Sequence, residues 1–319
     1  MHIWFNLAVY GAADRTIAHL SASHHGVFAK SHADLAGFTA EQRKQRIETG
    51  QWTVLHEAVY RLSGVPATWK GDVLAACWAG GFRAVASHRS AAALWGLAGG
   101  KRSIQEIMCP RWRRAQHAPL VVHESKALDP VDTTFADGIP VTTPERTLLD
   151  LGAVCGPRTV EMAFNRAEHQ ELVTLDSVRR MLTRLARSGR PGVRKLRRVL
   201  EVRQPGQRAP ESEMETMLIQ ILREWGFPEG VPQFEIWMRG RFIARVDLAF
   251  PEQRVAVEYD SDEWHGGRGV NERDASRRRR LRQYDWETVT ATRADVVNDA
   301  PETRAALRVA LNRPRFGVA

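Results

Sequence analysis

The sequence has only three cysteines, no internal repeat and no low-complexity tract, and each shortage excludes a class of protein. Cys77, Cys109 and Cys155 are odd in number and far apart, so neither a disulfide framework nor a zinc cluster is expected. The apolar opening over residues 1–13 is interrupted by Asn6, lacks a preceding Lys or Arg, and is too short to span a bilayer. We therefore expect an uncertain N-terminal extension there, no membrane partner, and a reducing, cytoplasmic setting.

Basic residues outnumber acidic ones in this chain. Its 46 Lys and Arg against 37 Asp and Glu give a net charge of +9 and an isoelectric point of about 10.0. This balance favours a polyanionic partner such as DNA. The length of 319 residues predicts two or three domains, and a hydrophobic content of 43% is ample for folded cores, which excludes a disordered chain.

Two acidic stretches in the C-terminal third have the alternation of a β-hairpin. In Arg245–Phe250 and Val255–Asp260, large apolar residues alternate with charged or small ones, which is the period of half-buried strands. If residues 251–254 form a four-residue turn, Phe250 pairs with Val255. The hairpin is then predicted to have one apolar face and one acidic face.

The acidic face of this hairpin predicts a cation site. Counting back from the turn sets Asp247 opposite Glu258 and Arg245 opposite Asp260. Directly opposed residues have Cβ atoms about 5 Å apart, so an Asp facing a Glu is destabilising unless a cation lies between them. The alternative is a solvated strand face on which Arg245 and Arg254 neutralise the carboxylates.

The spacing of these acidic residues resembles a known nuclease pattern. Asp247, ten intervening residues and Glu258-Tyr-Asp260 resemble the PD-(D/E)xK motif. The longer run is similar to the very-short-patch-repair (Vsr-like) branch: Glu258-Tyr-Asp-Ser-Asp-Glu-Trp-His265, Arg273-Asp274, Leu281 and Trp286. The resemblance covers roughly Glu211 to Leu311, and upstream Glu215 stands where that family carries an acidic residue on its first helix.

By that resemblance, residues 211–312 form a restriction-endonuclease-like α/β domain with a central mixed sheet, which hydrolyses phosphodiester bonds. Asp247 and Glu258 would hold Mg²⁺ or Mn²⁺, which lowers the pKa of water and neutralises charge on the scissile phosphate. The candidate catalytic residues are Glu215, Asp247, Glu258, Asp260 and His265. Asp260 replaces the lysine of the standard motif, so that positive charge is missing. His265 either assists as acid or base or is a packed loop residue.

An arginine-rich helix is predicted after this motif. Residues 273–282 carry six arginines against Asp274 alone, and four of the arginines are consecutive. Guanidinium groups bind phosphate oxygens bidentately, and phosphate neutralisation supplies most of the sequence-independent affinity for DNA. We expect Arg277 or Arg278 to face the acidic pocket, with Arg280 as a further phosphate contact. The alternative is a solvated helix face.

Three short helical patterns and a hairpin follow the N-terminal extension. Helices are predicted over Ile17–His24, Lys30–Ala36 and Thr39–Thr49, and strands over Trp52–Leu55 and Ala58–Leu62. The third helix begins with a capping-box spacing, Thr39-Ala-Glu-Gln42. This order over residues 14–64 predicts a winged helix-turn-helix, with Arg43, Lys44 and Arg46 on the helix that enters the major groove. A winged-helix module used for protein contacts is the alternative.

Residues 65–203 are predicted to form a mixed α/β middle domain. Strands are expected over Ser103–Cys109, Leu120–His123 and Ile139–Thr142. Helices begin at Ser87-His-Arg-Ser90 and at Thr143-Pro-Glu-Arg146, where Thr143 is the cap and Pro144 the first helical residue. With the N-terminal module, these motifs resemble the AbiEi-like antitoxin family of type IV toxin–antitoxin systems, over roughly residues 14–200. That resemblance implies operator binding, repression and a cognate toxin as partner.

A basic surface is predicted just before the linker at residues 204–210. Ser177–Arg208 carries eleven Lys or Arg residues, and interleaved apolar residues make its two helices amphipathic. We expect Arg194, Arg197 and Arg198 on the polar face to contact DNA.

The sequence as a whole predicts an α+β multidomain protein: a winged-helix reader, an AbiEi-like middle domain and a Vsr-like nuclease domain. The favoured function is a DNA-binding, Mg²⁺-dependent endonuclease. The alternative is an AbiEi-like antitoxin or repressor with a catalytically inactive nuclease fold, and a protein-interaction scaffold is a third class. Intact carboxylates favour the enzyme, because a protein that only binds DNA has no need of an opposed acidic pair.

Overall fold

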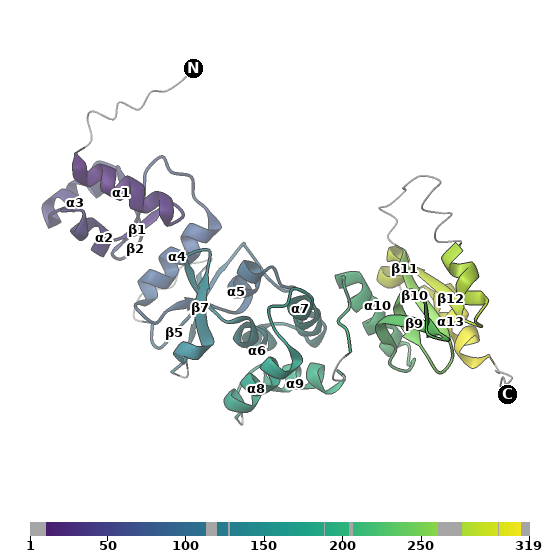
Figure 1. Cartoon of the computed structure of the whole chain (residues 1–319). Coiled ribbons are helices and arrows are strands. Elements are labelled where there is room, and N and C mark those ends of the chain that lie inside the picture. The colour runs from purple at the N-terminus through teal and green to yellow at the C-terminus, as the bar shows by residue number, and fades with distance from the viewer. Residues whose placement is uncertain are drawn as a thin grey trace, which may run out of the picture. The chain divides into compact units, whose positions relative to one another are not determined.

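The computed structural model describes residues 11–112, 120–126, 128–187, 189–203, 207–260, 276–298 and 300–313. The chain divides into two compact units, which are described separately. Unit 1 contains the described residues up to Cys155 together with Met181–Arg194, and unit 2 contains Gly156–Arg180 and the described residues from Lys195 onward. The described elements are mixed α/β with three sheets (Figure 1). The expected nuclease segment falls entirely within unit 2.

The N-terminal part of unit 1 alternates short helices with a three-stranded sheet of order β1-β3-β2. Its elements are α1 (Ala12–Ser23), β1 (Val27–Ala29), α2 (Lys30–Leu35), α3 (Ala40–Glu48), β2 (Trp52–His56) and β3 (Val59–Leu62). The three helices and the hairpin follow the predicted order. The capping box is confirmed, since Thr39 Oγ1 accepts from Gln42 N–H and Gln42 Oε1 accepts from Thr39 N–H. The first helix begins at Ala12, so residues 12 and 13 are not part of an extension.

Packing of aromatic side chains holds this N-terminal part together. Phe28, Trp52 and Tyr60 are buried, with Phe28 and Trp52 edge to face at 4.8 Å between ring centroids.

The strand β1 was not predicted, because three residues are too short to show an alternation and the strand exists only through its pairing with β3.

A five-stranded mixed sheet of order β6-β5-β4-β8-β7 forms the centre of unit 1. The elements are α4 (Trp69–Gly80), β4 (Val85–Ala86), α5 (His88–Trp95), β5 (Gln105–Cys109), β6 (Leu120–Glu124), β7 (Thr133–Ala136), β8 (Ile139–Thr142) and α6 (Pro144–Val154). The three predicted strands are present. Thr143 caps α6 and Pro144 is its first residue, as predicted. The helix α4 packs its Val73, Leu74 and small residues against the sheet in the main core of this unit.

Two amphipathic helices, α8 (Leu175–Leu185) and α9 (Val193–Glu201), follow α7 (Pro157–His169). Their apolar residues, including Val178, Leu182, Leu196 and Leu200, are buried. The predicted division of these helices into an apolar and a basic face is therefore confirmed.

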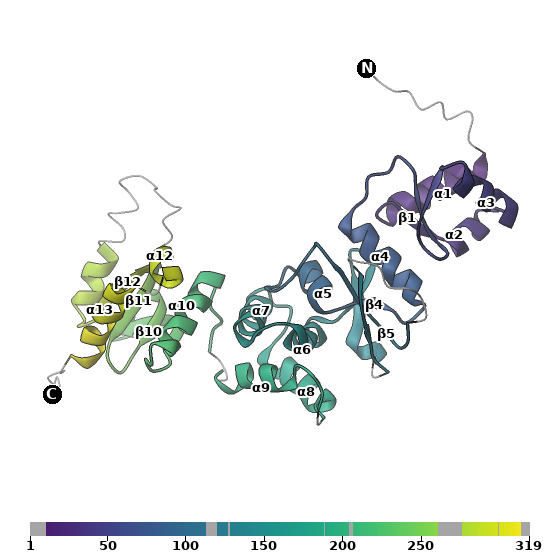
Figure 2. The same cartoon turned by 180° about the vertical axis from the view of Figure 1, so that it is seen from behind.

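The C-terminal sheet lies in unit 2 and has the order β12-β11-β10-β9. Its elements are α10 (Glu213–Glu224), β9 (Val231–Met238), β10 (Arg241–Phe250), β11 (Val255–Asp260), β12 (Glu287–Thr292), α12 (Arg293–Asn298) and α13 (Pro301–Asn312), with a further helix over residues 276–282. The sheet is mixed, because β11 pairs antiparallel with β10 and parallel with β12. Figure 2 shows α10, α12 and α13 around these strands.

Both faces of this sheet are covered. Leu248 and Val257 pack with Leu218 of α10 and Leu307 of α13. On the other side, the small side chains of Ala249 and Ala256 leave room for a second core that contains Leu281 and Trp286. The expectation of one apolar and one acidic face is therefore wrong near the turn, where both faces are buried. Among the described helices, none has the length and apolar character needed to cross a membrane.

Candidate functional site

The predicted hairpin forms, and its register is confirmed near the turn. Phe250 pairs with Val255, and the ladder continues to Leu248 and Val257. There the described ladder between β10 and β11 ends, and Tyr259 N–H donates to Asp247 Oδ2 at 2.9 Å. The Asp247 side chain thus takes the place of a backbone acceptor at the point where the strands part.

The expected opposition of Arg245 and Asp260 is not part of this ladder. On its other edge β10 pairs Arg245 with Glu235 of β9, and the Arg245 guanidinium forms an ion pair of 3.0 Å with Glu211. Asp260 lies at the exposed end of β11, where it pairs with Thr292 of β12. The described ladder between β10 and β11 ends before these residues, where the Asp247 side chain accepts from Tyr259 N–H.

Glu215, Gln233 and Asp247 converge at the start of α10. The Glu215 carboxylate accepts from Glu211 N–H at 3.0 Å and from Gln233 Nε2 at 2.8 Å. Gln233 also lies close enough to Asp247 to lower the pKa of that carboxyl group. It is buried and has a φ of 49°, a left-handed conformation that a residue with a side chain rarely adopts. The strand β9 is therefore distorted at the residue that lies beside the two carboxylates.

Burial raises the pKa of both carboxyl groups above their ordinary values. For Asp247, desolvation raises the pKa, while the Tyr259 N–H and the charge of Arg277 oppose that effect. Desolvation also raises the pKa of Glu215, and the nearby charge of Asp247 adds to this increase. Such groups gain most from a positive charge placed beside them.

Glu258 faces the helix over residues 276–282. Its side chain is 5% exposed, and its Oε2 lies 3.0 Å from Nη2 of Arg277. The same guanidinium lowers the pKa of Asp247. Arg277, one of the two arginines expected to face the acidic pocket, therefore contacts Glu258, and the metal ion predicted between Asp247 and Glu258 stays a prediction.

The donor set around Arg277 fits a hard divalent cation. Asp247 and Glu258 both lie near the Arg277 guanidinium, and Glu215 lies near Asp247. Within the described segments, no group of three or more His, Cys, Asp or Glu side chains is arranged to hold a metal ion. Asp247 and Glu258 alone are sufficient for Mg²⁺, because this ion is commonly held by one or two carboxylates and several waters.

The other predicted residues of this region differ in their placement. His265 lies outside the described residues. Arg278 is half-buried, and its Nε has no partner among the described groups. Arg280 is exposed. Only Arg277 of the three is in contact with a described carboxylate of the site.

The cations of α3 serve mainly to hold that helix in place. Arg43 donates to Asp34 and to the Phe38 carbonyl oxygen, and Arg46 donates to Asp14 at 2.7 Å. Lys44 is exposed, 3.7 Å from Glu48. By contrast, all three cations predicted on α9, Arg194, Arg197 and Arg198, are exposed.

Sequence reasoning missed Gln233 and a separate buried ionic cluster in unit 1. In that cluster Arg146, 1% exposed, contacts Asp132 and Asp150, and Arg184 also contacts Asp132. Polar residues scattered over three elements have no spacing that predicts such a cluster, and nothing in the sequence around Gln233 marks its conformation.

A further buried carboxylate of unit 1, that of Glu106, anchors α5. Glu106 accepts from the backbone N–H of Arg89 at 2.6 Å and from its guanidinium at 2.9 Å. His123 lies 3.5 Å from Glu106, and its ring stacks on His88 with centroids 3.5 Å apart. Ser87, His88 and Arg89 thus form the polar first turn that fixes the helix to β5.

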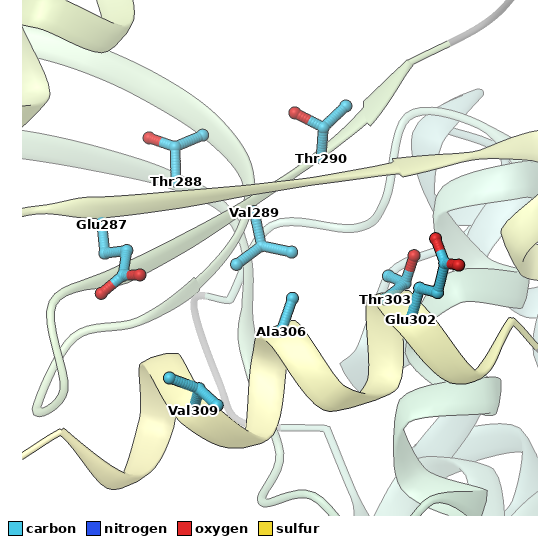
Figure 3. Close-up of a pocket in the computed structure, with 8 residues that line it drawn as sticks. All are labelled: Glu287, Thr288, Val289, Thr290, Glu302, Thr303, Ala306 and Val309. Carbon is cyan, nitrogen blue, oxygen red and sulfur yellow. The ribbon is translucent and has the colours of Figure 1, made fainter.

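A groove of about 570 Å³ lies between β12 and α13 (Figure 3). Val289 points toward Ala306 of the helix, whereas Thr288 and Thr290 point away from it. The described lining includes Glu287 and Glu302 and no cation. None of the lining residues belongs to the carboxylate cluster.

No family model matches the chain. It is similar to two proteins of Mycobacterium tuberculosis, the uncharacterized proteins MT2308 (strain CDC 1551 / Oshkosh) and Rv2248 (strain ATCC 25618 / H37Rv). The identity to each is 31% over 167 residues, which is 49% of this chain. The chain spans about 60% of the length of each of these relatives.

Proposed function

We propose that this protein is a DNA-binding, metal-dependent endonuclease whose phosphodiester-cleaving site is built from Glu215, Asp247 and Glu258. One observation carries the proposal: Asp247 lies close to Gln233, which donates to Glu215, and close to Arg277, which pairs with Glu258, so that these three carboxylates have one guanidinium among their described contacts. A pair kept only for stability would be expected to have matched charges, since uncompensated buried carboxylates are costly. Perturbed carboxylates of this kind are typical of functional sites.

Each side chain has a distinct role in the proposed site. Asp247 and Glu258 would hold Mg²⁺ or Mn²⁺, which supplies an activated water and neutralises charge on the phosphate. Gln233 orients Glu215 by donating to its carboxylate, and it lowers the pKa of the nearby Asp247. Arg277 would leave Glu258 for the scissile phosphate. It thereby supplies the positive charge that Asp260 cannot.

The fold supports this proposal in two regions. In unit 2, a mixed sheet with Asp247 and Glu258 on neighbouring strands and Glu215 on the preceding helix has the arrangement expected for a restriction-endonuclease-like domain. In unit 1, the order of helices and strands over residues 12–62 and the sheet order β1-β3-β2 support a winged helix-turn-helix. By this proposal the winged helix and the exposed cations of α9 bind DNA.

The second candidate is an AbiEi-like repressor or antitoxin in which the nuclease fold only binds. The observation that favours it is the ion pair between Arg277 and Glu258, in which a guanidinium already neutralises one metal-binding carboxylate. The outward residues of α3 weaken a DNA-reading role for this helix under either proposal, however. Glu41, Lys44 and Glu48 are exposed there, so this face has one cation against two carboxylates.

Cleavage of DNA by the purified full chain tests the proposal. Wild type and Glu258→Gln are incubated with supercoiled, linear and single-stranded DNA in Mg²⁺, Mn²⁺ or EDTA. We expect cleavage by wild type only with metal, and a loss of at least about 100-fold in Glu258→Gln, because a metal ligand is removed. Glu252→Gln, an exposed carboxylate in the turn of the same hairpin, is the matched control and keeps full activity. Absence of cleavage by wild type, with DNA binding retained, would select the repressor.

A further inference from the structure

The tip of the β9–β10 hairpin carries an exposed aromatic pair. Trp237 and Phe242 are directly paired across the strands, 55% and 47% exposed, and their rings meet edge to face with centroids 5.4 Å apart. The Trp237 indole N–H donates to Glu235 at 3.2 Å, which fixes the orientation of the ring. Below the pair, Ile236 and Ile243 are buried in the core and anchor the hairpin. Two large aromatic rings are thus held rigidly in solvent.

Two arginines lie at the turn of this hairpin. The turn consists of Arg239 and Gly240, both with positive φ, as in the two-residue turns that match the twist of a hairpin. Arg239 adopts this conformation although Asn or Gly would do so with less strain. Arg239 and Arg241 are exposed, and neither has an acidic partner among the described residues. The tip therefore carries two exposed cations, Arg239 in the turn and Arg241, which pairs with Met238 and so lies on the face of the hairpin opposite the rings.

We propose that this hairpin tip is a stacking platform for the unpaired bases of single-stranded DNA. Bases stack on exposed aromatic faces, and nearby arginines neutralise the phosphates that connect them. The two charges and the small apolar area argue against a protein partner, whose interface core is larger and poor in charge. The chain's net charge of +9 is consistent with a polyanionic ligand.

The position of the platform connects it with the carboxylate cluster. Gln233 lies four residues along β9 from Trp237, which corresponds to roughly 13 Å at the usual rise of a strand. A stacked strand advances about 3.4 Å per nucleotide, so about four nucleotides separate a base on Trp237 from a phosphate at Asp247. In this respect the inference rests on the proposed function, because it assigns the substrate of that site an unpaired segment.

Binding of a fluorescent twenty-nucleotide thymidine oligomer tests the platform. Anisotropy is measured in EDTA, with the full chain in the Glu258→Gln background, so that binding is observed without cleavage. We expect Trp237→Ala to weaken binding about tenfold, in line with the contribution of one stacked base, and Trp237→Phe to retain most of it. Phe82→Ala, which removes an exposed aromatic from unit 1, is the control and leaves the affinity unchanged.

The salt dependence separates stacking from charge. Arg239→Gln and Arg241→Gln should each reduce the slope of log affinity against log salt by about 0.7, the value for one phosphate contact on a single strand. Trp237→Ala should lower the affinity without changing this slope. Equal losses on single-stranded and fully paired duplex oligomers, or an unchanged affinity of Trp237→Ala, would overturn the platform. A change in sedimentation of Trp237→Ala with unchanged DNA affinity would show instead that the pair contacts a second copy of the chain.

The outcome is independent of the cleavage experiment. A platform that binds single strands in a chain that never cleaves DNA would leave this inference standing and remove the nuclease. If the Trp237→Ala variant cleaves DNA and binds single strands as tightly as wild type, the nuclease stands and the platform is ruled out.

Discussion

One carboxylate cluster in unit 1 and one in unit 2 differ in the cations placed beside them. In unit 1, Asp132, Asp150 and Glu106 are accompanied by three guanidinium groups, those of Arg146, Arg184 and Arg89. In unit 2, the carboxylates Glu215, Asp247 and Glu258 have Arg277 as the described guanidinium contact. The first cluster is matched in charge and the second is not.

This difference separates a cluster that holds a fold together from one that is suited to a ligand. A buried ion pair with its partners in place is stable, but it loses several kcal/mol when one partner is removed. An unmatched group of carboxylates gains free energy when a cation arrives. The two clusters should therefore respond in opposite ways to mutation and to metal.

The largest expected effect is in unit 1. Arg146→Leu removes the guanidinium that touches both Asp132 and Asp150 and leaves them buried, so we expect a loss of about 3–5 kcal/mol in the free energy of unfolding. Urea denaturation followed by circular dichroism measures the loss. Arg184→Leu, whose side chain is 41% exposed, should cost far less. A loss below about 1 kcal/mol for Arg146→Leu would contradict the structural role of this cluster.

The pH dependence of the free energy of unfolding tests two buried residues of unit 1, His88 and Asp150, and the expected change is smaller. Burial lowers the pKa of His88 to about 3, so the unfolded chain takes up a proton below about pH 6.5 that the folded chain refuses. The contribution of His88 to the free energy of unfolding therefore falls as the pH decreases. Burial raises the pKa of Asp150 to about 6, so its contribution falls as the pH increases from about 3.8 to 6. The two effects oppose each other between pH 4 and 6.

Asp150→Asn should make the contribution of His88 to the pH dependence of unfolding measurable, because the opposing contribution of Asp150 is removed. Relative to wild type, this variant should lose stability on acidification from pH 6 to pH 4, by about 2 kcal/mol in total. Denaturation in urea at pH 4, 5 and 6 gives the difference, and adding His88→Asn to the variant should remove it. A variant that follows wild type at all three pH values would show that Asp150 is charged throughout.

Metal should stabilise unit 2 by a smaller amount. Arg277→Gln removes the guanidinium that competes for Glu258, so Mg²⁺ should raise the melting temperature of this variant more than that of wild type. At free Mg²⁺ ten times the dissociation constant, the gain is about 1.4 kcal/mol. Differential scanning calorimetry with Mg²⁺ and with EDTA measures it. Arg277→Gln combined with Glu258→Gln should not respond, and a response equal to that of Arg277→Gln alone would place the ion elsewhere.

The smallest effect is expected for Asp247→Asn without metal. Because burial raises the pKa of Asp247, the folded state favours its protonated form, and its contribution to stability is lost as the pH increases through the folded pKa. The asparagine still accepts from Tyr259 N–H but carries no charge. We expect the variant to gain stability relative to wild type between pH 4 and 7, by less than about 1 kcal/mol. A loss of stability at pH 7 would show that the Asp247 charge is already compensated.

Much of the local structure could be predicted from the sequence. The Thr39 capping box, the Thr143 cap with Pro144, and the pairing of Phe250 with Val255 depend on residues close together in the chain, so their spacing is visible in the sequence. The strands that were missed, β1, β4, β7 and β9, are short, irregular or dependent on a distant partner.

The candidate site could be predicted only in part. The spacing of Asp247 and Glu258 placed them on neighbouring strands, and it predicted a cation beside them. That Arg277 rather than Arg278 contacts Glu258, and that Gln233 donates to Glu215 beside Asp247, depends on segments far apart in the chain. No periodicity relates such residues, because their proximity arises when the helix and β9 pack against the hairpin.

Most of the elements, their caps and the acidic and basic segments of this protein follow from its sequence, because they depend on neighbouring residues and on composition. Which charges meet depends on how distant segments pack. This packing placed Arg43 and Arg46 in contacts that hold α3, gave Arg146 to two buried carboxylates, and left Glu215, Asp247 and Glu258 in excess over Arg277. The physical reason is that the free energy of a charge depends on its burial and its partners, and both are set by packing between distant segments.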